Sequence, residues 1–190
     1  MMRNAILVML AAVVGTSGAI AQDPPADRQI AGAVSPLPDS LRPGAAVLGY
    51  RQGSLVALRQ GTNAMICVAD DPAASGFHAA CYHRDLEPFM ARGRALRAAG
   101  NSRPEVDSIR FAEIEGDRLP MPEHPAALYS VFLQSEFDPA TGLPAEARGL
   151  YVIYMPYATE ESTGISTTPA PDRPWLMFPG MPWAHVMISR

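Results

Sequence analysis

The sequence predicts an α+β domain built on a mostly antiparallel sheet, in the order β-β-β-α-α-β-β-β with the helices packed on one face. Two observations support this fold class. Short apolar runs separated by turn formers stand at both ends of the chain, and two segments with helix-cap signals lie between them. The 190 residues fit one domain, which we assign to residues 44–190 behind an N-terminal targeting segment.

The first three strands are expected in three apolar runs, Ala46–Tyr50, Ser54–Leu58 and Ala64–Val68. Gln52-Gly53 and Gly61-Thr62-Asn63 separate these runs, and such residues favour turns. The pattern therefore predicts a three-stranded antiparallel meander. Asp70–Ala80, which contains proline and glycine, is expected to form the loop that follows.

Two helices are expected next. Asp85 is a good N-cap for the first helix, and Gly100 is a suitable stop. Ser102 and Glu105 then stand three residues apart, which is the spacing of a capping box. The second helix is expected to end at Gly116.

The last third of the chain is again rich in β-formers. Strands are expected at Ala127–Gln134, Gly149–Met155 and Trp183–Ile188. Asp138–Gly142 separates the first two and has a proline at its second position and a late glycine, which favours a turn. Thr159–Pro174 is polar and expected to be irregular.

The N-terminus has the features of a secretory signal peptide over Met1–Ala21: a positive start, the apolar run Ala5–Val14, and small residues at Ala19 and Ala21. The apolar run is too short to span a membrane. We therefore expect an exported protein, periplasmic or extracellular, without a transmembrane segment. The next segment, Gln22–Pro43, is rich in proline and is expected to be a flexible leader.

The two cysteines, Cys67 and Cys81, are expected to form a disulfide, because exported domains commonly use cysteines in this way. Closing a loop of this length contributes roughly 3 kcal/mol in the chain-entropy account. A reactive thiol or metal pair is the alternative, and the spacing is far from a C-x-x-C motif.

Composition and motifs exclude several function classes. All 15 basic residues are arginine, which a codon bias alone can produce, and the net charge is −4, which argues against nucleic-acid binding. The sequence contains no G-x-S-x-G, H-E-x-x-H, P-loop or G-x-G-x-x-G motif. Neither an enzymatic activity nor a cofactor follows from the residues.

The best candidates for a ligand pocket lie near the C-terminus: Tyr151, Tyr154, Trp183, His185 and Met187. In a strand, His185 shares a face with Trp183 and Met187. A histidine there is either a core group with one partner or the polar floor of a pocket. The tyrosines either line such a pocket or simply cover the sheet.

Metal binding is a weaker interpretation. His78 and His83 flank Cys81, but their spacing matches no zinc pattern, and solvent-facing histidines are the alternative. A second set offers thioether and imidazole groups that suit Cu(I), although methionine is also an ordinary core filler: Met177, Met181, His185 and Met187.

Three stretches carry a resemblance: Leu58–Val68, Tyr154–Thr159 and Pro182–Ile188. They resemble a group of uncharacterised exported bacterial proteins, and the similarity runs from about Gly44 to Ile188. The resemblance implies a common domain and export. It carries over no catalytic residue.

The leading hypothesis is an exported, non-catalytic module that binds a small ligand or a protein partner. The alternative is an exported hydrolase or metal-dependent enzyme that uses His185 as general base or ligand. A periplasmic metal carrier is the third hypothesis.

Overall fold

The computed structural model describes residues 23–189, so the predicted signal peptide over Met1–Ala21 lies outside the described residues. The elements follow one another as α1 (Ala26–Val34), β1 (Ala46–Arg51), β2 (Ser54–Arg59), β3 (Met65–Val68), β4 (Phe77–His83), the 3-10 helix η1 (Arg84–Leu86), α2 (Glu87–Ala98), α3 (Arg103–Glu115), β5 (Ala126–Leu133), β6 (Arg148–Tyr154), α4 (Glu160–Thr163), β7 (Trp175–Met177) and β8 (His185–Ser189).

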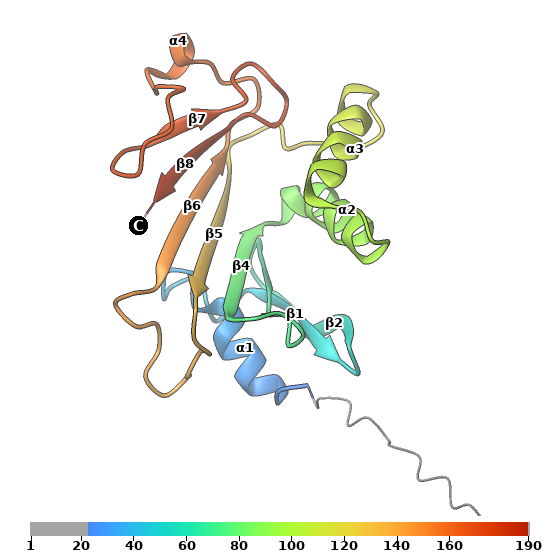
Figure 1. Cartoon of the computed structure of the whole chain (residues 1–190), viewed down its shortest axis with the longest axis vertical. Helices are drawn as coiled ribbons and strands as arrows, with labels where there is room; N and C mark the ends of the chain where they lie inside the picture. Colours follow the sequence, from blue (N-terminus) through green and yellow to red (C-terminus); the bar gives the residue numbers. More distant parts are fainter. Residues whose placement is uncertain (1–22, 190) are drawn as a thin grey trace, which may run out of the picture.

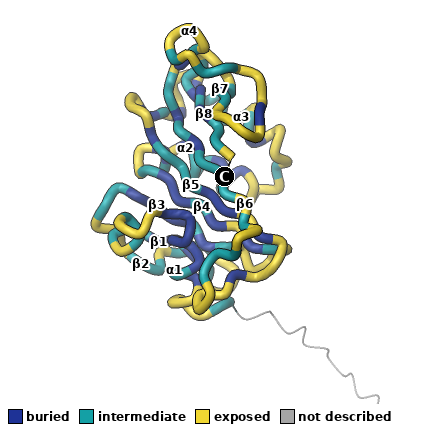
Figure 2. Tube along the Cα trace, turned by 90° about the vertical axis from the view of Figure 1, so that its left-hand side faces the viewer, coloured by how far each residue is buried: buried dark blue, intermediate teal, exposed yellow. Residues whose placement is uncertain are grey.

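The eight strands form one sheet in the order β2-β1-β3-β4-β5-β6-β8-β7 (Figure 1). Every neighbouring pair is antiparallel except β1 and β3, which run parallel. The predicted α+β class and mostly antiparallel sheet are confirmed. Figure 2 shows the buried residues concentrated along the middle of the sheet and the exposed ones in the loops.

The predicted meander is wrong in its third strand. β1 and β2 form a hairpin, whose turn residues Gln52 and Gly53 both have positive φ. The chain then crosses the start of β1, where the amides of Thr62 and Asn63 donate to the carbonyl of Gly44 at 2.7 and 3.0 Å. This crossing places β3 on the other side of β1, in parallel pairing.

The predicted loop Asp70–Ala80 is also too long, because β4 begins at Phe77. The sequence signal was weak here, since alanine and histidine are poor strand formers. The disulfide is confirmed: Cys67 in β3 and Cys81 in β4 face one another in register, with an S–S distance of 2.05 Å. The bond therefore joins two neighbouring strands of the sheet rather than tying down a loop.

The N-terminal segment differs from the predicted flexible leader over Gln22–Pro43, because α1 forms within it. The prolines lie on either side of the helix instead of inside it, where they would break it. Gln29 is buried and fixes α1 to β1: its side chain donates to the carbonyl of Tyr50 at 3.0 Å and accepts from the Tyr50 amide at 2.7 Å. The packed part of the chain thus begins before Gly44.

Helices cover both faces of the sheet, so the prediction that they share one face is wrong. α1 packs against a buried cluster that includes Val47, Met65 and the disulfide; we call this side the α1 face. α2 and α3 lie on the opposite side, against Tyr82, Val152 and Tyr154; we call this the α2–α3 face. The order of helices and strands along the chain also differs from the prediction. α1 precedes β1, β4 precedes α2, and α4 and β7 follow β6.

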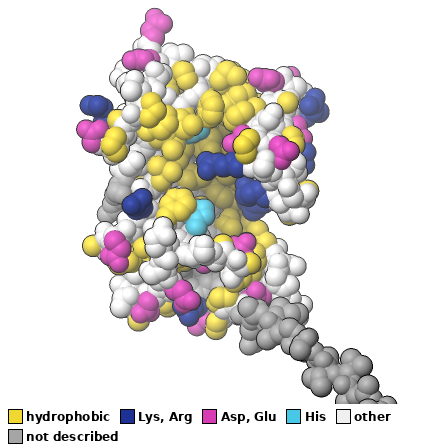
Figure 3. Space-filling view, viewed as in Figure 1, with side chains coloured by type: hydrophobic (Ala, Val, Ile, Leu, Met, Phe, Trp, Pro, Cys, Tyr) yellow, Lys and Arg dark blue, Asp and Glu magenta, His cyan; other side chains and the backbone are white. Residues whose placement is uncertain are grey.

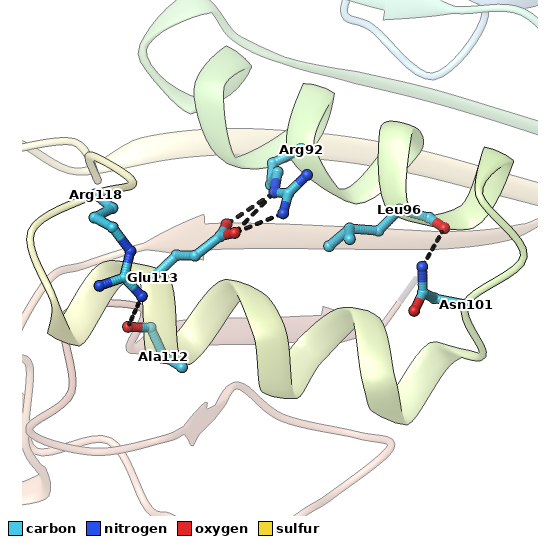
Figure 4. Close-up of polar contacts among 6 residues, drawn as sticks. All are labelled: Arg92, Leu96, Asn101, Ala112, Glu113 and Arg118. Atoms are coloured by element: carbon cyan, nitrogen blue, oxygen red, sulfur yellow. Dashed lines mark hydrogen bonds and ion pairs between the residues drawn. The ribbon is translucent and has the colours of Figure 1, made fainter.

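The two middle helices begin and end close to the predicted positions. The capping box of Ser102 and Glu105 starts α3, with the Ser102 amide donating to the carboxylate at 2.7 Å. Arg92 of α2 donates three hydrogen bonds of 2.6, 2.8 and 3.1 Å to the Glu113 carboxylate of α3, which joins the two helices (Figure 4).

The C-terminal strands agree with the sequence. β5, β6 and β8 lie within one or two residues of the predicted ranges, and Asp138–Gly142 closes a turn through a bond of 2.9 Å from the Gly142 amide to the Asp138 carbonyl. The polar segment Thr159–Pro174 contains the single turn α4. Among residues 23–189, no helix is long and apolar enough to cross a membrane.

Candidate functional site

The α2–α3 face is only partly covered by its helices, and its open part is apolar. Half-buried side chains from four strands form this surface: Val68, Leu128, Leu150 and Met187. Figure 3 shows hydrophobic side chains gathered between the sheet and the helices, with arginine and histidine side chains among them. We call this surface the groove; the four side chains are its floor, and α2 and α3 form its wall.

His185 and Tyr154 lie at one end of the groove, in directly paired positions of β8 and β6. Their ring centroids are 4.9 Å apart. The carbonyl of Trp183, 2.8 Å from Nδ1 of His185, can only accept a hydrogen bond, so this nitrogen carries the proton. Nε2 of the neutral ring is therefore an acceptor. Burial lowers the pKa of His185 and keeps the ring neutral at pH 7.

Tyr154 is a buried residue, and its hydroxyl makes no hydrogen bond within residues 23–189. Burial raises its pKa to about 12, so the group is a hydrogen-bond donor at any physiological pH. The guanidinium of Arg110 and the carboxylate of Asp107 are close enough to shift this pKa in opposite directions. Tyr154 thus brings an unused donor to the boundary between α3 and the sheet.

Trp183 closes this end of the groove. It is 3 % exposed, and its ring stacks on Phe111 of α3 at 4.1 Å. Its Nε1 group is buried and has no partner within the described residues. Phe178, partly exposed and in a left-handed backbone conformation, lies edge-on to Phe111 at 5.4 Å and 5.8 Å from the His185 ring. Phe178 therefore screens His185 from solvent.

Arg110 of α3 contributes a positive charge whose position is fixed by its contacts. Its guanidinium lies 3.8 Å from the centre of the Phe89 ring and donates to Asp107 at 2.5 Å. A further bond of 3.3 Å reaches the Phe89 carbonyl. The side chain is 11 % exposed, and its Nε group has no partner in the described chain. Such stacking and pairing fix the guanidinium in one position.

Two more arginines project from α2, and they differ in their partners. Arg94 donates to Glu87 at 2.7 Å and to the Tyr82 hydroxyl at 2.6 Å, and that hydroxyl donates to Glu87 at 2.6 Å. Arg97 makes no hydrogen bond or ion pair within residues 23–189. Its pKa is lowered by burial and by the charges of Arg110 and Arg94. Arg97 is thus an exposed cation that forms no ion pair within the described residues.

The other end of the groove holds His78 and Phe132, whose rings stack at 4.3 Å. Nε2 of His78 lies 3.0 Å from the hydroxyl of Ser130, a buried residue of β5. Burial and the charge of Arg97 lower the pKa of His78. A histidine beside a serine is the geometry of a nucleophile and its base. Ser130, however, lies in β5, between β4 and β6. The backbone amides around it bond to the neighbouring strands, so they are not free to form an oxyanion hole.

The structure brings four of the five predicted pocket residues to one side of the sheet. Tyr154, His185 and Met187 lie on the α2–α3 face, and Trp183 belongs to the same buried cluster. Tyr151 lies on the α1 face, where its ring contacts Tyr129 at 5.3 Å. The side-chain alternation along β6 separates it from Tyr154.

The groups weighed as metal ligands are spread out. His78 and His83 lie at opposite ends of β4 and on opposite faces of the sheet, and Cys81 is used in the disulfide. Within residues 23–189, no group of three or more histidine, cysteine, aspartate or glutamate side chains could hold a metal ion. Met177 does lie directly across from His185 in the ladder of β7 and β8.

Sequence reasoning missed the arginines of the wall and the Ser130 hydroxyl. One signal was present: Gly93 interrupts the first helix, and an isolated glycine in a helix often has a packing reason. Asp107 and Arg110, three residues apart on α3, were a second signal. Which side chains of β4 and β5 meet depends on register, which the sequence left open.

Two open hollows lie near the segment between α3 and β5 and share the lining residues Met121, Pro122 and Glu123. Neither is lined by a predicted pocket residue. The groove is the stronger candidate because buried polar groups without partners gather around it, and such groups need an explanation. No family model, curated protein or solved structure matches this chain.

Proposed function

We propose that the protein is an exported, non-catalytic module that binds a small, largely apolar ligand in the groove. Ligand sites are generally apolar surfaces with a few fixed polar groups. The floor offers the apolar part, and the end of the groove at His185 offers the polar part.

One observation carries the proposal: two buried donors around this end have no partner within residues 23–189, namely Nε1 of Trp183 and Nε of Arg110. A buried donor without a partner costs roughly 1–3 kcal/mol. Two of them at one end of the groove are hard to explain by packing alone. The Tyr154 hydroxyl and Nε2 of His185 give a ligand one donor and one acceptor.

Hydrolysis at His185 has less support. A general base needs a hydroxyl, water or carboxylate within hydrogen-bond reach. Among residues 23–189, the hydrogen-bond partner of the His185 ring is the Trp183 carbonyl, which orients the ring but supplies no nucleophile. The pair of His78 and Ser130 has a nucleophile but no oxyanion hole.

Binding of a soft metal is the second candidate, because the β7–β8 ladder places Met177 across from His185. Met187 lies two residues further along β8 on the same face. Thioether and imidazole ligands together suit Cu(I). Native mass spectrometry of the protein purified from its own host separates the two candidates, since a copper ion and an organic ligand add different masses.

Binding of the neutral dye Nile red, followed by its fluorescence, tests for an apolar site in the groove. Leu150→Gln introduces a polar group on the floor, and Ile153→Gln makes the equivalent change on the other face of β6. We expect Leu150→Gln to weaken dye binding at least about tenfold, the equivalent of 1.4 kcal/mol. The matched Ile153→Gln variant should bind like the wild type. Equal binding by both variants, or no binding by the wild type, would contradict the proposal.

A further inference from the structure

Gly93 occupies the middle of α2, where glycine is less favourable than alanine. A Cβ atom at this position would lie 2.8 Å from Nη1 of Arg110, and 3.5 Å from Nη1 of Arg97. The first distance is too short for any side chain to fit without moving Arg110. Gly93 therefore makes room for two guanidinium groups, one from each helix, that converge over the same point of α2.

The charges around this point do not balance. Arg110 is paired with Asp107, and Arg94 with Glu87. Arg97 has no carboxylate partner in the described chain; Tyr50 and Asp107 are near enough to favour its charge but form no bond with it. His78, which also faces Arg97, is neutral at pH 7 because its pKa is lowered. Arg97 is thus an exposed guanidinium at the wall of the groove that is not engaged in an ion pair within the described residues.

From this convergence we infer that the ligand of the groove is a monocarboxylate with an apolar chain, its carboxylate held between Arg97 and Arg110 and its chain lying on the floor. The inference rests on the proposed function. Two guanidinium groups suit a planar carboxylate, which accepts paired bonds from them. One cation outside an ion pair matches one negative charge. The apolar floor beside it favours a chain over a small free anion such as phosphate.

Titration calorimetry with decanoate and with decan-1-ol, which differ in the head group alone, tests the inference. The wild type should bind decanoate at least about tenfold more tightly, as expected for a charge-assisted hydrogen bond. Arg97→Gln should remove this difference by weakening decanoate and leaving the alcohol unchanged. Arg51→Gln, which neutralises an exposed arginine at the end of β1 outside the groove, is the control and should bind as the wild type does.

Gly93→Ala is a second test. If Gly93 served only to pack the helices, this substitution would not change the affinity for decanoate. Alanine is the better helix former, which offsets part of the cost of moving Arg110 away from Phe89 and Asp107, so the variant should still fold. Because its methyl group displaces the Arg110 guanidinium, it should nevertheless lose affinity for decanoate about tenfold and keep its affinity for the alcohol. Unchanged decanoate binding in Gly93→Ala and Arg97→Gln would overturn the inference. If neither compound binds the wild type, the proposed function itself fails.

Discussion

The two faces of the sheet are formed by the same strands but differ in how completely they are covered. On the α1 face, α1 and the disulfide seal a cluster in which Leu37, Val47 and Cys67 are almost fully buried. On the α2–α3 face, the helical hairpin leaves a half-open floor, and Nε of Arg110 and Nε1 of Trp183 have no partner within the described residues; at the end of α1, the Ser35 hydroxyl is the one such group. The first face has the closed packing that stabilises a fold. The second retains features that cost stability, which is characteristic of binding sites.

The hairpin of α2 and α3 is itself well held, so the openness of the second face is not a sign of loose packing. Arg92 and Glu113 bind the helices to one another (Figure 4). The Ser102–Glu105 capping box fixes the start of α3. The groove is therefore an open surface between rigid elements. Rigid walls suit a preformed site.

Leucine truncation gives the largest expected contrast between the faces. Leu37→Ala removes a side chain that is 1 % exposed on the α1 face and should lower the free energy of unfolding by about 2–5 kcal/mol. Leu150→Ala removes a half-buried side chain of the floor and should lower it by about 1 kcal/mol. Urea denaturation measures both. Equal losses would show that the floor is as tightly packed as the α1 face.

A pair of tyrosines sharpens the comparison within the α2–α3 face. The hydroxyl of Tyr82 bonds to Glu87 and Arg94, whereas that of Tyr154 has no partner in the described chain. Tyr82→Phe should therefore lower the free energy of unfolding by about 1–3 kcal/mol. Tyr154→Phe should change it by less than about 1 kcal/mol, since the hydroxyl that it removes makes no hydrogen bond within the described residues.

Thermal denaturation of the two phenylalanine variants, without added ligand, measures this difference. The same Tyr154→Phe protein should bind ligand less tightly if the hydroxyl serves the groove. A marked loss of stability in Tyr154→Phe would mean that the hydroxyl already has a structural role.

How far the sequence predicts this molecule depends on the kind of signal. Local signals succeeded: the capping box of Ser102 and Glu105, the turn at Asp138–Gly142, and the pairing of the two cysteines. Non-local pairing was predicted poorly. β3 is parallel to β1 because the chain passes the start of β1 near Gly44, and no residue pattern in the sequence indicates this. α1 was hidden because flanking prolines made its segment resemble a leader.

The candidate site divides in the same way. Strand alternation was enough to group His185 with Met187, because both belong to one element. The same alternation places Tyr151 and Tyr154, three residues apart in one predicted strand, on opposite faces, so it argued against a pocket lined by both. It could not say that Arg97 and Arg110 meet over Gly93. Meetings between side chains of different helices follow from packing geometry, which a single sequence does not encode locally.

A dependence of stability on pH is the smallest expected effect, and it concerns the open face alone. The pKa values of His78 and His185 are both lowered by burial, so each ring binds a proton more weakly in the folded protein than in the unfolded chain. As pH falls through the unfolded value of about 6.5, the unfolded chain gains more protons than the folded one, and stability decreases. The decrease ends once the pH has passed the lowered folded values. Above pH 7 neither histidine contributes a slope.

Thermal midpoints at pH 7.5 and 5.5 test this, with the double variant His78→Gln/His185→Gln as control. The wild-type midpoint should fall on acidification by less than Leu37→Ala lowers it at neutral pH, and the variant should fall less than the wild type. Glu105 and Glu113 also have shifted pKa values, but theirs are lowered by hydrogen bonds and act below this range. Parallel behaviour of the two proteins would mean that both imidazoles are solvated as freely as in the unfolded chain. The end of the groove at His185 would then lack the partly dry environment that is typical of a ligand site.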